Sequence, residues 1–377
     1  MIEAEKIVNC LNAAGIDFFA GVPDSLLKSF CAYVTDTCGE RHVIAANEGG
    51  AVGLAAGHYL ATGRPALVYM QNSGQGNAVN PLCSLADPDV YSIPMVLLVG
   101  WRGEPGVKDE PQHVKQGKVT ISLFETLGIP TEVLPDDESA ALEVTRKMVE
   151  TAKSGSRPGA LIVRKGLFAE YKLQFPKPSV ADLKREQAIE EILKSLPEDA
   201  VVVSTTGMIS REVYETRERL GQDHSRDFLT VGSMGHAIMI ALGIARSQPN
   251  RHVFCLDGDG ASIMQMGNMA IAGQSGCANL THIVLNNAAH DSVGGQPTVG
   301  GDIDLSSIAA SCGYDVLSNP ESSATLHLCF SALKTITTKP EFIEIKVAKG
   351  ARKDLGRPKE PPQVNKKLYM KTLGVEG

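Results

Sequence analysis

Residues 252–260, HVFCLDGDG, run from an apolar segment into a polar turn in which two glycines flank Asp259. A second apolar run, residues 281–285, ends in Asn286-Asn287. Apolar runs separated by a helical segment predict a right-handed β-α-β unit with two buried parallel strands. Both polar turns then follow the carboxyl ends of neighbouring strands, where α/β sheets bind ligands. This stretch therefore predicts a ligand site at one edge of a parallel sheet.

The rest of the chain repeats this alternation of apolar runs and helical segments. In the first half the sequence predicts strands at residues 17–20, 42–45, 66–70, 95–100 and 160–164, and a glycine- and alanine-rich helix at 49–61. In the second half it predicts strands at residues 200–204, 252–257, 281–285 and 341–346, and helices at 185–195, 211–220, 236–246 and 262–272. We therefore expect an α/β protein with two doubly wound parallel-sheet domains.

A proline-containing stretch separates the two predicted domains. Because residues 168–179 break the periodic pattern, we expect domains at residues 1–168 and 183–377, joined by a linker at 169–182. The segment from Lys349 to Lys371 is basic and contains proline, so we expect it to run over the surface.

Composition argues against several classes of partner. The 377 residues include 36 Lys and Arg against 43 Asp and Glu, a net charge of −7, which disfavours nonspecific binding to nucleic acid or to an anionic membrane surface. No apolar stretch approaches the roughly 20 residues of a membrane-spanning helix, and the charged N-terminus lacks the apolar core of a secretory signal. We therefore expect a cytoplasmic protein. The eight cysteines include no Cys-x-x-Cys pair, so we expect neither zinc sites nor structural disulfides.

The two polar turns suit a divalent cation and a diphosphate. Asp259, Asn287 and a main-chain carbonyl just beyond offer the hard oxygen ligands that Mg²⁺ prefers. Gly258 and Gly260 let a diphosphate approach the backbone, and a helix that begins near Ala261 adds amide donors. An EF-hand is excluded because serine stands where its loop needs glycine, and no Walker or dinucleotide-binding motif is present. An ordinary turn at Asp259 is the alternative.

The spacing of these motifs resembles that of a known family. Gly258-Asp259-Gly260, 25 intervening residues and Asn286-Asn287 resemble the signature of thiamine diphosphate enzymes. The resemblance implies that Asp259, Asn287 and the carbonyl of Ala289 hold Mg²⁺, with Ala288 where many relatives have glycine. It also implies a homodimer or a larger oligomer, because in this family the metal-binding motif and the activating acid come from different subunits.

The activating acid of this family is a glutamate that hydrogen-bonds the aminopyrimidine ring of the cofactor. Residues 45–51, AANEGGA, place Glu48 between a predicted strand and a helix of small residues, where burial favours a shared proton. A role only as a partner of the helix dipole is the alternative. We expect Glu48 to be the main catalytic residue.

Three further segments resemble the cofactor-binding loops of this family. They are a loop facing the pyrimidine ring at residues 72–77, a strand-to-helix turn near the diphosphate at 205–210, and a segment at 231–235 whose Met234 wedges between the cofactor rings. Ordinary turns, and core packing for Met234, are the alternatives. The resemblance implies these cofactor-binding residues: Glu48, Asn72, Gln75, Thr206, Gly207, Met208, Gly232, Ser233, Met234, Gly258, Asp259, Gly260, Ala261, Asn287, Ala289 and His290.

Over nearly the whole chain the sequence is similar to the phosphonopyruvate decarboxylases of this family. Residues 21–25, 100–106, 112–113, 286–297 and 349–358 carry the similarity. It implies decarboxylation of 3-phosphonopyruvate to phosphonoacetaldehyde and CO₂ in phosphonate biosynthesis. Sulfopyruvate or another 2-keto acid as substrate is one alternative, and a noncatalytic phosphate-binding paralogue is another.

The same resemblance suggests how protons and the substrate are handled. Asp24 corresponds to an active-site aspartate, with His113 as its partner in proton transfer. His290 is either a substrate ligand or a structural hydrogen-bonding residue. The candidate cations for the phosphonate, each with a solvated surface charge as the alternative, are Arg102, Lys108, Arg352, Lys353 and Arg357.

Overall fold

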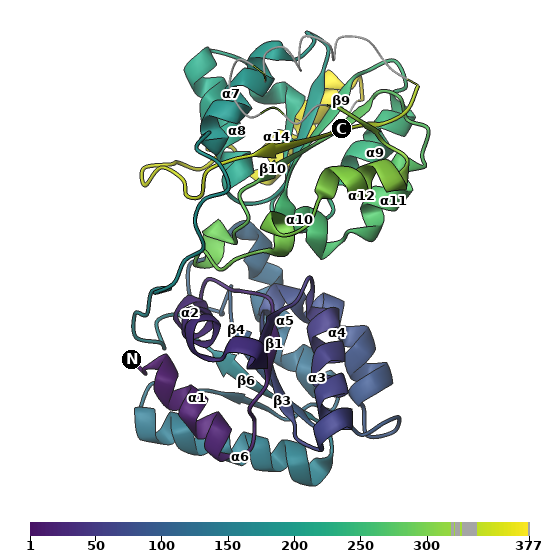
Figure 1. The fold of residues 1–377 in the computed structure, drawn as a ribbon. Helices are drawn as coiled ribbons and strands as arrows, with labels where there is room; N and C mark the ends of the chain where they lie inside the picture. The colour runs from purple at the N-terminus through teal and green to yellow at the C-terminus, as the bar shows by residue number, and fades with distance from the viewer. Residues whose placement is uncertain (318–319, 321–324, 326–337, 376–377) are drawn as a thin grey trace. The chain divides into compact units, whose positions relative to one another are not determined.

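The computed structural model describes residues 1–317, 320, 325 and 338–375 (Figure 1). The chain divides into two compact units: Met1–Pro176 with Ser292–Gln296, and Lys177–Asp291 with Pro297–Gly377. All seven cysteines in the described residues are free, and Cys329 lies outside them. No helix in the described part of the chain is long and apolar enough to cross a bilayer.

The first unit contains a six-stranded sheet in which all strands are parallel, in the order β2-β1-β3-β4-β6-β5. Its strands are β1 (Phe19–Gly21), β2 (His42–Ile44), β3 (Ala66–Gln71), β4 (Met95–Gly100), β5 (Thr131–Val133) and β6 (Pro158–Val163). Its helices are α1 (Ala4–Ala13), α2 (Lys28–Thr37), α3 (Glu48–Thr62), α4 (Gln75–Pro81), α5 (Pro111–Thr126) and α6 (Glu138–Gly155).

Helices cover both faces of this sheet because its central strands are apolar on both sides. In β3, Leu67 and Tyr69 belong to a cluster with α1, α2 and α6, whereas Val68 and Met70 belong to a cluster with α3, α4 and α5. Fully buried parallel strands read as continuous apolar runs for this reason.

The second unit also contains a six-stranded parallel sheet, in the order β11-β12-β10-β9-β7-β8. Its strands are β7 (Val201–Ser204), β8 (Asp227–Leu229), β9 (Val253–Gly258), β10 (Leu280–Asn286), β11 (Asp315–Val316) and β12 (Glu341–Lys346). Its helices are α7 (Arg185–Ser195), α8 (Met208–Leu220), α9 (Ala237–Ser247), α10 (Asp259–Met264), α11 (Gly267–Gly273), α12 (Leu305–Cys312) and α14 (Pro362–Thr372). In Figure 1, α7 and α8 lie on one side of this sheet, and α9, α11 and α12 lie on the other, in agreement with two separate apolar clusters. The predicted α/β class with two doubly wound parallel sheets is confirmed.

Three sequence expectations need correction. The edge strands β5, β8 and β11 were not predicted, because their sequences, TEV, DFL and DV, contain no continuous apolar run. The predicted helix at 262–272 is two helices, α10 and α11, separated at Gln265, whose ψ of 49° is not helical. The tail does not simply run over the surface: it contains α14, whose Tyr369 is buried and whose Asn365 donates to the Asp227 carbonyl oxygen at 2.8 Å.

Candidate active site

The polar residues of the first unit gather where its strands end. Glu48 follows β2, Asp24 follows β1, Asn77 lies beyond β3 and Arg102 lies beyond β4. Since these four strands are parallel neighbours, their carboxyl ends form one continuous edge of the sheet. Parallel sheets bind ligands at this edge, so the topology alone brings these groups to a functional position.

Glu48 is the first residue of α3, and only 5% of it is exposed. Asn47 caps this helix, because its Oδ1 accepts from the backbone N–H of Gly50 at 2.9 Å. The Glu48 carboxylate accepts a hydrogen bond from Asn77 Nδ2 at 2.7 Å through Oε2. Burial raises the pKa of Glu48, although the Asn77 hydrogen bond opposes this, and no ion pair in the described residues involves Glu48.

Gly74 packs directly against this carboxylate. A Cβ built at position 74 would lie 2.2 Å from Glu48 Oε1, so any side chain there would displace the acid. Neither Gly74 nor Asn77 was predicted to contact Glu48, although both lie in the predicted 72–77 loop. Glycine three residues before an asparagine in a turn is too common a pattern to identify such a contact.

Asn72 and Gln75, two of the predicted cofactor-binding residues, form hydrogen bonds with protein groups. Asn72 Nδ2 donates to the Arg102 carbonyl oxygen at 2.7 Å and to Thr120 Oγ1 at 2.8 Å, and Gln75 Nε2 donates to the Thr120 carbonyl oxygen at 3.0 Å. Both side chains are buried. Their bonds fix the 72–77 loop on α5 and so hold Gly74 and Asn77 against Glu48.

Asp24 is fully buried, and its carboxylate is only half satisfied. Its Oδ2 accepts from the N–H groups of Leu26 at 2.9 Å and Leu27 at 3.2 Å, whereas its Oδ1 has no partner in the described residues. Burial raises the pKa of Asp24 to about 6, against the opposing effects of these hydrogen bonds and of Arg102. Asp24 is therefore poised to exchange a proton near neutral pH.

Arg102 and His113 lie within electrostatic reach of one another. The Arg102 guanidinium donates from Nε to Asp109 at 2.8 Å, and its Nη1 donates to Ser25 Oγ at 2.8 Å. His113 is buried and its Nδ1 has no partner among the described residues. Burial, reinforced by the Arg102 charge, lowers the pKa of His113 to about 4, so the imidazole is neutral at pH 7.

In the second unit, Asp259 begins α10 directly after β9 and is 2% exposed. Its carboxylate accepts from Thr298 Oγ1 and from the backbone N–H of Asn287. Burial raises the pKa of Asp259 to about 6, and no ion pair in the described part of the chain involves this acid. Gly300 leaves the necessary space, since a Cβ there would lie 2.6 Å from Asp259 Oδ2.

The loop after β10 brings the other predicted metal ligands to the same place. Ala288 has a φ of 54°, which turns the chain between Asn287 and Ala289. Asn287 Oδ1 accepts from the Ala289 N–H at 3.1 Å. The ring of His290 packs over Gly260, where a Cβ would lie 3.4 Å from its Cε1, and burial lowers the pKa of His290 to about 4.

The remaining predicted cofactor segments also meet in this unit. The Gly232 N–H donates to Thr206 Oγ1 at 3.0 Å, so the turns after β7 and β8 are joined. Positive φ values at Gly232, Ser233 and Gly235 form a tight turn that presents a half-buried Met234. Gly207 has a φ of 100° immediately before α8 begins at Met208, and Ala261 is buried within α10.

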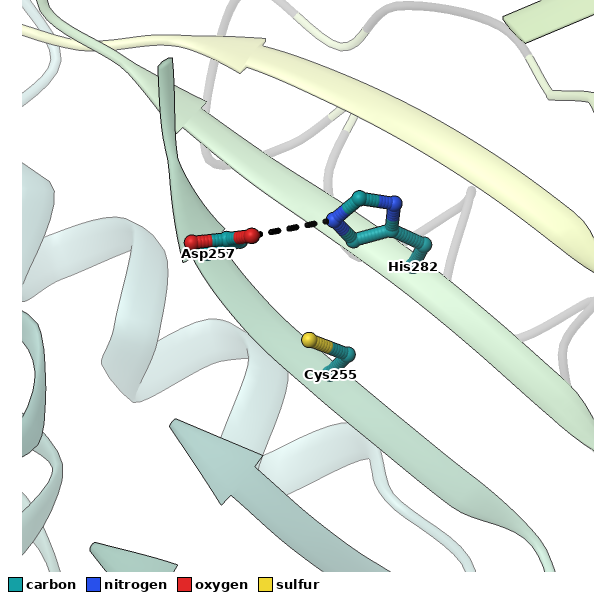
Figure 2. A group of neighbouring side chains, drawn as sticks. All are labelled: Cys255, Asp257 and His282. Atoms are coloured by element: carbon teal, nitrogen blue, oxygen red, sulfur yellow. Dashed lines mark ion pairs between the residues drawn. The ribbon is translucent and has the colours of Figure 1, made fainter. Parts of the chain in front are cut away.

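Cys255, Asp257 and His282 form a buried group beside these turns, on the neighbouring strands β9 and β10 (Figure 2). Their potential ligand atoms all lie within 4.8 Å of one another, and His282 Nε2 lies 3.4 Å from Asp257 Oδ2. Asp257 also accepts from the Gly258 N–H at 2.9 Å and from Ser262 Oγ at 3.2 Å. This group could not be predicted from the sequence, because its members are neighbours across two strands and have no characteristic short spacing. Asp257 supports the turn that carries Asp259.

The predicted phosphonate cations are spread over both units. Arg352 forms ion pairs with Glu186, Glu215 and Asp354, and it lies over α7 and α8. Lys108, Lys353 and Arg357 are exposed.

The residues of the second unit fit a divalent cation. The Asp259 carboxylate accepts from the backbone of Asn287, and the Asn287 side chain adds an amide oxygen, so the two residues offer hard oxygen donors of the kind that Mg²⁺ prefers. A buried carboxylate without a cationic partner is unfavourable, and a bound cation would provide the missing positive charge.

Comparisons with known proteins agree with this arrangement. The N-terminal and C-terminal thiamine pyrophosphate-binding domains of thiamine pyrophosphate enzymes match residues 2–123 and 205–345. Phosphonopyruvate decarboxylases of Streptomyces viridochromogenes and Streptomyces hygroscopicus are each 35% identical to the chain over 96% of its length and 92% of theirs. A sulfopyruvate decarboxylase of Methanosarcina acetivorans is 27% identical over 99% of this chain and 98% of its own.

These matches confirm thiamine diphosphate as the cofactor, and Mg²⁺ is the usual partner metal of such enzymes. The full-length relatives are named as decarboxylases, which supports an enzyme over the noncatalytic alternative. The chain therefore belongs to the thiamine diphosphate-dependent decarboxylases, a family of carboxy-lyases.

Proposed function

We propose that this enzyme decarboxylates 3-phosphonopyruvate to phosphonoacetaldehyde and CO₂, with thiamine diphosphate and Mg²⁺, as a step of phosphonate biosynthesis. Two phosphonopyruvate decarboxylases that are 35% identical over nearly the whole chain support this substrate over others. The observation that carries the proposed chemistry is the buried, unpaired carboxylate of Glu48 held by Asn77.

Within this proposal Asp259, Asn287 and the Ala289 carbonyl hold Mg²⁺, and the turns around Gly207, Gly258 and Gly260 accept the diphosphate. When bound, thiamine diphosphate supplies a nucleophilic carbon and then accepts the electrons released as the substrate loses its carboxylate. Met234 would support the rings of the cofactor from its tight turn, and His290 packs over Gly260 in one of the turns that would accept the diphosphate.

Glu48 activates the cofactor by holding a proton at Oε1. The other carboxylate oxygen, Oε2, is occupied by Asn77, so the hydrogen-bonding direction of the acid is fixed. Because burial raises the pKa of Glu48, its protonated form is available nearer to neutral pH than in water. The water-poor setting also strengthens the bond that Glu48 makes.

Asp24 and His113 transfer protons to and from the substrate. Asp24 Oδ1 and His113 Nδ1 are both buried atoms without a partner in the described residues, which fits groups that wait for a substrate. With a pKa of about 6, Asp24 can accept or release a proton at Oδ1. Arg102, which is ion-paired with Asp109, supplies a positive charge near both groups, and it is our first candidate for the phosphonate.

The subunit and domain arrangement is part of the proposal. We assign residues 1–168 to pyrimidine binding, 169–182 to a linker, and 183–377 to diphosphate and metal binding with a basic tail. The active form is a homodimer or a larger oligomer in which Glu48 of one subunit and Asp259 of another serve the same cofactor. The cytoplasmic location stays a prediction from the sequence.

Sulfopyruvate is the second candidate substrate, since a sulfopyruvate decarboxylase is similar over 99% of the chain. The decisive experiment compares kcat/KM for phosphonopyruvate, sulfopyruvate and pyruvate in the presence and absence of both cofactors. We expect phosphonopyruvate to be preferred, and we expect Glu48→Gln and Asp259→Ala to lose activity. If the folded protein with both cofactors leaves phosphonopyruvate unchanged, the proposed function is wrong.

A further inference from the structure

Asp291 connects the metal-ligand loop to two distant parts of the second unit. Its Oδ2 accepts from Asn287 Nδ2 at 2.6 Å, from the backbone N–H of Gly350 at 2.9 Å and from Arg185 Nη1 at 3.2 Å. Asn287 lies in the loop after β10, Gly350 lies in the C-terminal segment, and Arg185 lies in α7. One carboxylate oxygen therefore receives all three contacts.

Arg185 holds Asp291 from a rigid position. Its Nε and Nη2 donate to the two carboxylate oxygens of Glu212 at 2.7 Å and 3.0 Å. The side chains of Arg185 and Glu212 are only 5% and 3% exposed. A bidentate pair of this kind fixes the plane of the guanidinium, so the Asp291 carboxylate has a defined location.

The contact between Asp291 and Asn287 determines which way round the amide lies. The two ends of an asparagine amide have nearly the same shape, but only the oxygen can bind a metal ion. A carboxylate accepts hydrogen bonds and cannot donate them when it is ionised, so the end that faces Asp291 must be the NH₂ group. The oxygen then lies at the other end, where it contacts the Ala289 N–H at 3.1 Å.

We propose that Asp291 is a positioning residue that keeps the Asn287 amide oxygen turned toward the magnesium ion. The inference rests on the proposed function, because it assumes that Asn287 is a ligand. Partners behind metal ligands commonly change metal affinity by about 10- to 100-fold when they are removed.

The test measures metal binding directly rather than activity. Mn²⁺ takes the same oxygen ligands as Mg²⁺, and its free form is quantified by electron paramagnetic resonance in titrations of the full chain with thiamine diphosphate present. We expect Asp291→Ala to weaken Mn²⁺ binding by about 10- to 100-fold. Asp291→Asn keeps an oxygen acceptor for the same donors, so we expect a change below about threefold.

Asp304→Ala is the matched control. Asp304 caps α12 by accepting from the Ser307 N–H at 3.0 Å, so its removal lowers the melting temperature without contacting Asn287. We expect wild-type Mn²⁺ affinity in this variant. Equal weakening in Asp304→Ala and Asp291→Ala would overturn the proposal, because it would show a general effect of lost stability.

Asp291→Ala is also tested in a protein that carries Asn287→Asp, where the proposal predicts a different change in Mn²⁺ affinity. In Asn287→Asp both ends of the side chain are oxygens, so no orientation needs to be fixed, and Asp291 becomes a repulsive neighbour. We expect Asp291→Ala to leave Mn²⁺ affinity unchanged or higher in that background. A purely structural role predicts weaker binding in both backgrounds, which would refute the proposal. If the wild type itself fails to bind Mn²⁺ with the cofactor, the proposed function fails instead.

Discussion

Replacing Gly74 by alanine tests whether the position of Glu48 controls the reaction. The new Cβ would lie 2.2 Å from Glu48 Oε1 and 2.4 Å from Cδ. Ordinary contacts between such atoms begin near 3.5 Å, so the carboxyl group must move by at least about 1 Å. Gly74 has a φ of −76°, which alanine adopts without strain, so the effect on Glu48 is steric.

The size of the effect follows from this displacement. A misplacement of about 1 Å can reduce a rate by about 100-fold, which corresponds to about 2.7 kcal/mol in the barrier. Crowding a buried site also destabilises a fold by about 1–3 kcal/mol. We therefore expect Gly74→Ala to fold, to melt several degrees lower, and to lose about two orders of magnitude in kcat.

The assay follows phosphonoacetaldehyde formation at saturating cofactor, with Gly76→Ala as the matched control. Gly76 lies two residues further on, in α4, and a Cβ there would meet nothing within 4 Å. We expect this variant to keep the wild-type rate. Adding Gly74→Ala to Glu48→Gln should cause little further loss, because both changes act on the same group. A folded Gly74→Ala enzyme with a rate within threefold of wild type would refute the assignment of Glu48.

Three further predictions concern Asp24, Asn77 and Ala288. Burial raises the pKa of Asp24 from 3.8 to about 6, so ionising this buried carboxyl lowers the free energy of unfolding progressively as the pH rises from about 4 to 6. Urea unfolding of the cofactor-free protein should therefore show Asp24→Asn equal to wild type at pH 4 and up to about 3 kcal/mol more stable at pH 8. Asn77→Ala should reduce kcat by about 10- to 100-fold through the lost hydrogen bond to Glu48, whereas Asn80→Ala on the same helix should not. Ala288→Gly should raise stability by about 0.5–1 kcal/mol in thermal unfolding, because a φ of 54° is unfavourable for alanine, and an unchanged or lower melting temperature would contradict this explanation.

The parts of the fold that the sequence predicts are those with a strong local cause. The central strands are buried on both faces, so each leaves a continuous apolar run such as residues 95–100. Asp259 and Asn287 could be placed together because the carboxyl ends of neighbouring parallel strands always meet. The two-residue strand β11 and helix α14 could not be predicted, since both depend on contacts with distant residues, such as Asn365 with Asp227.

In the candidate active site, too, features with a local cause in the sequence can be predicted, whereas contacts between distant residues cannot. Residue types and strand ends predict which acids are functional, but they do not show what holds each acid in place. The contact of Gly74 with Glu48 and that of Asp291 with Asn287 each depend on how a loop closes in space. The bonds of Asn72 and Gln75 to Thr120 of α5 depend on the same kind of loop closure, and the sequence does not predict them.

Burial and a raised pKa alone do not separate the proposed functional acids of this enzyme from acids that serve the fold. Asp227 and Glu212 are buried with raised pKa values, but each is paired with an arginine and serves the fold. Glu341 is buried without an arginine, yet its side chain is bonded within the sheet to Thr281 at 3.0 Å. Asp24, Glu48 and Asp259 differ in two respects together: no ion pair in the described residues involves them, and they lie just beyond the carboxyl ends of β1, β2 and β9. The unfavourable burial of these three carboxylates is best explained by partners that arrive with cofactor, metal and substrate.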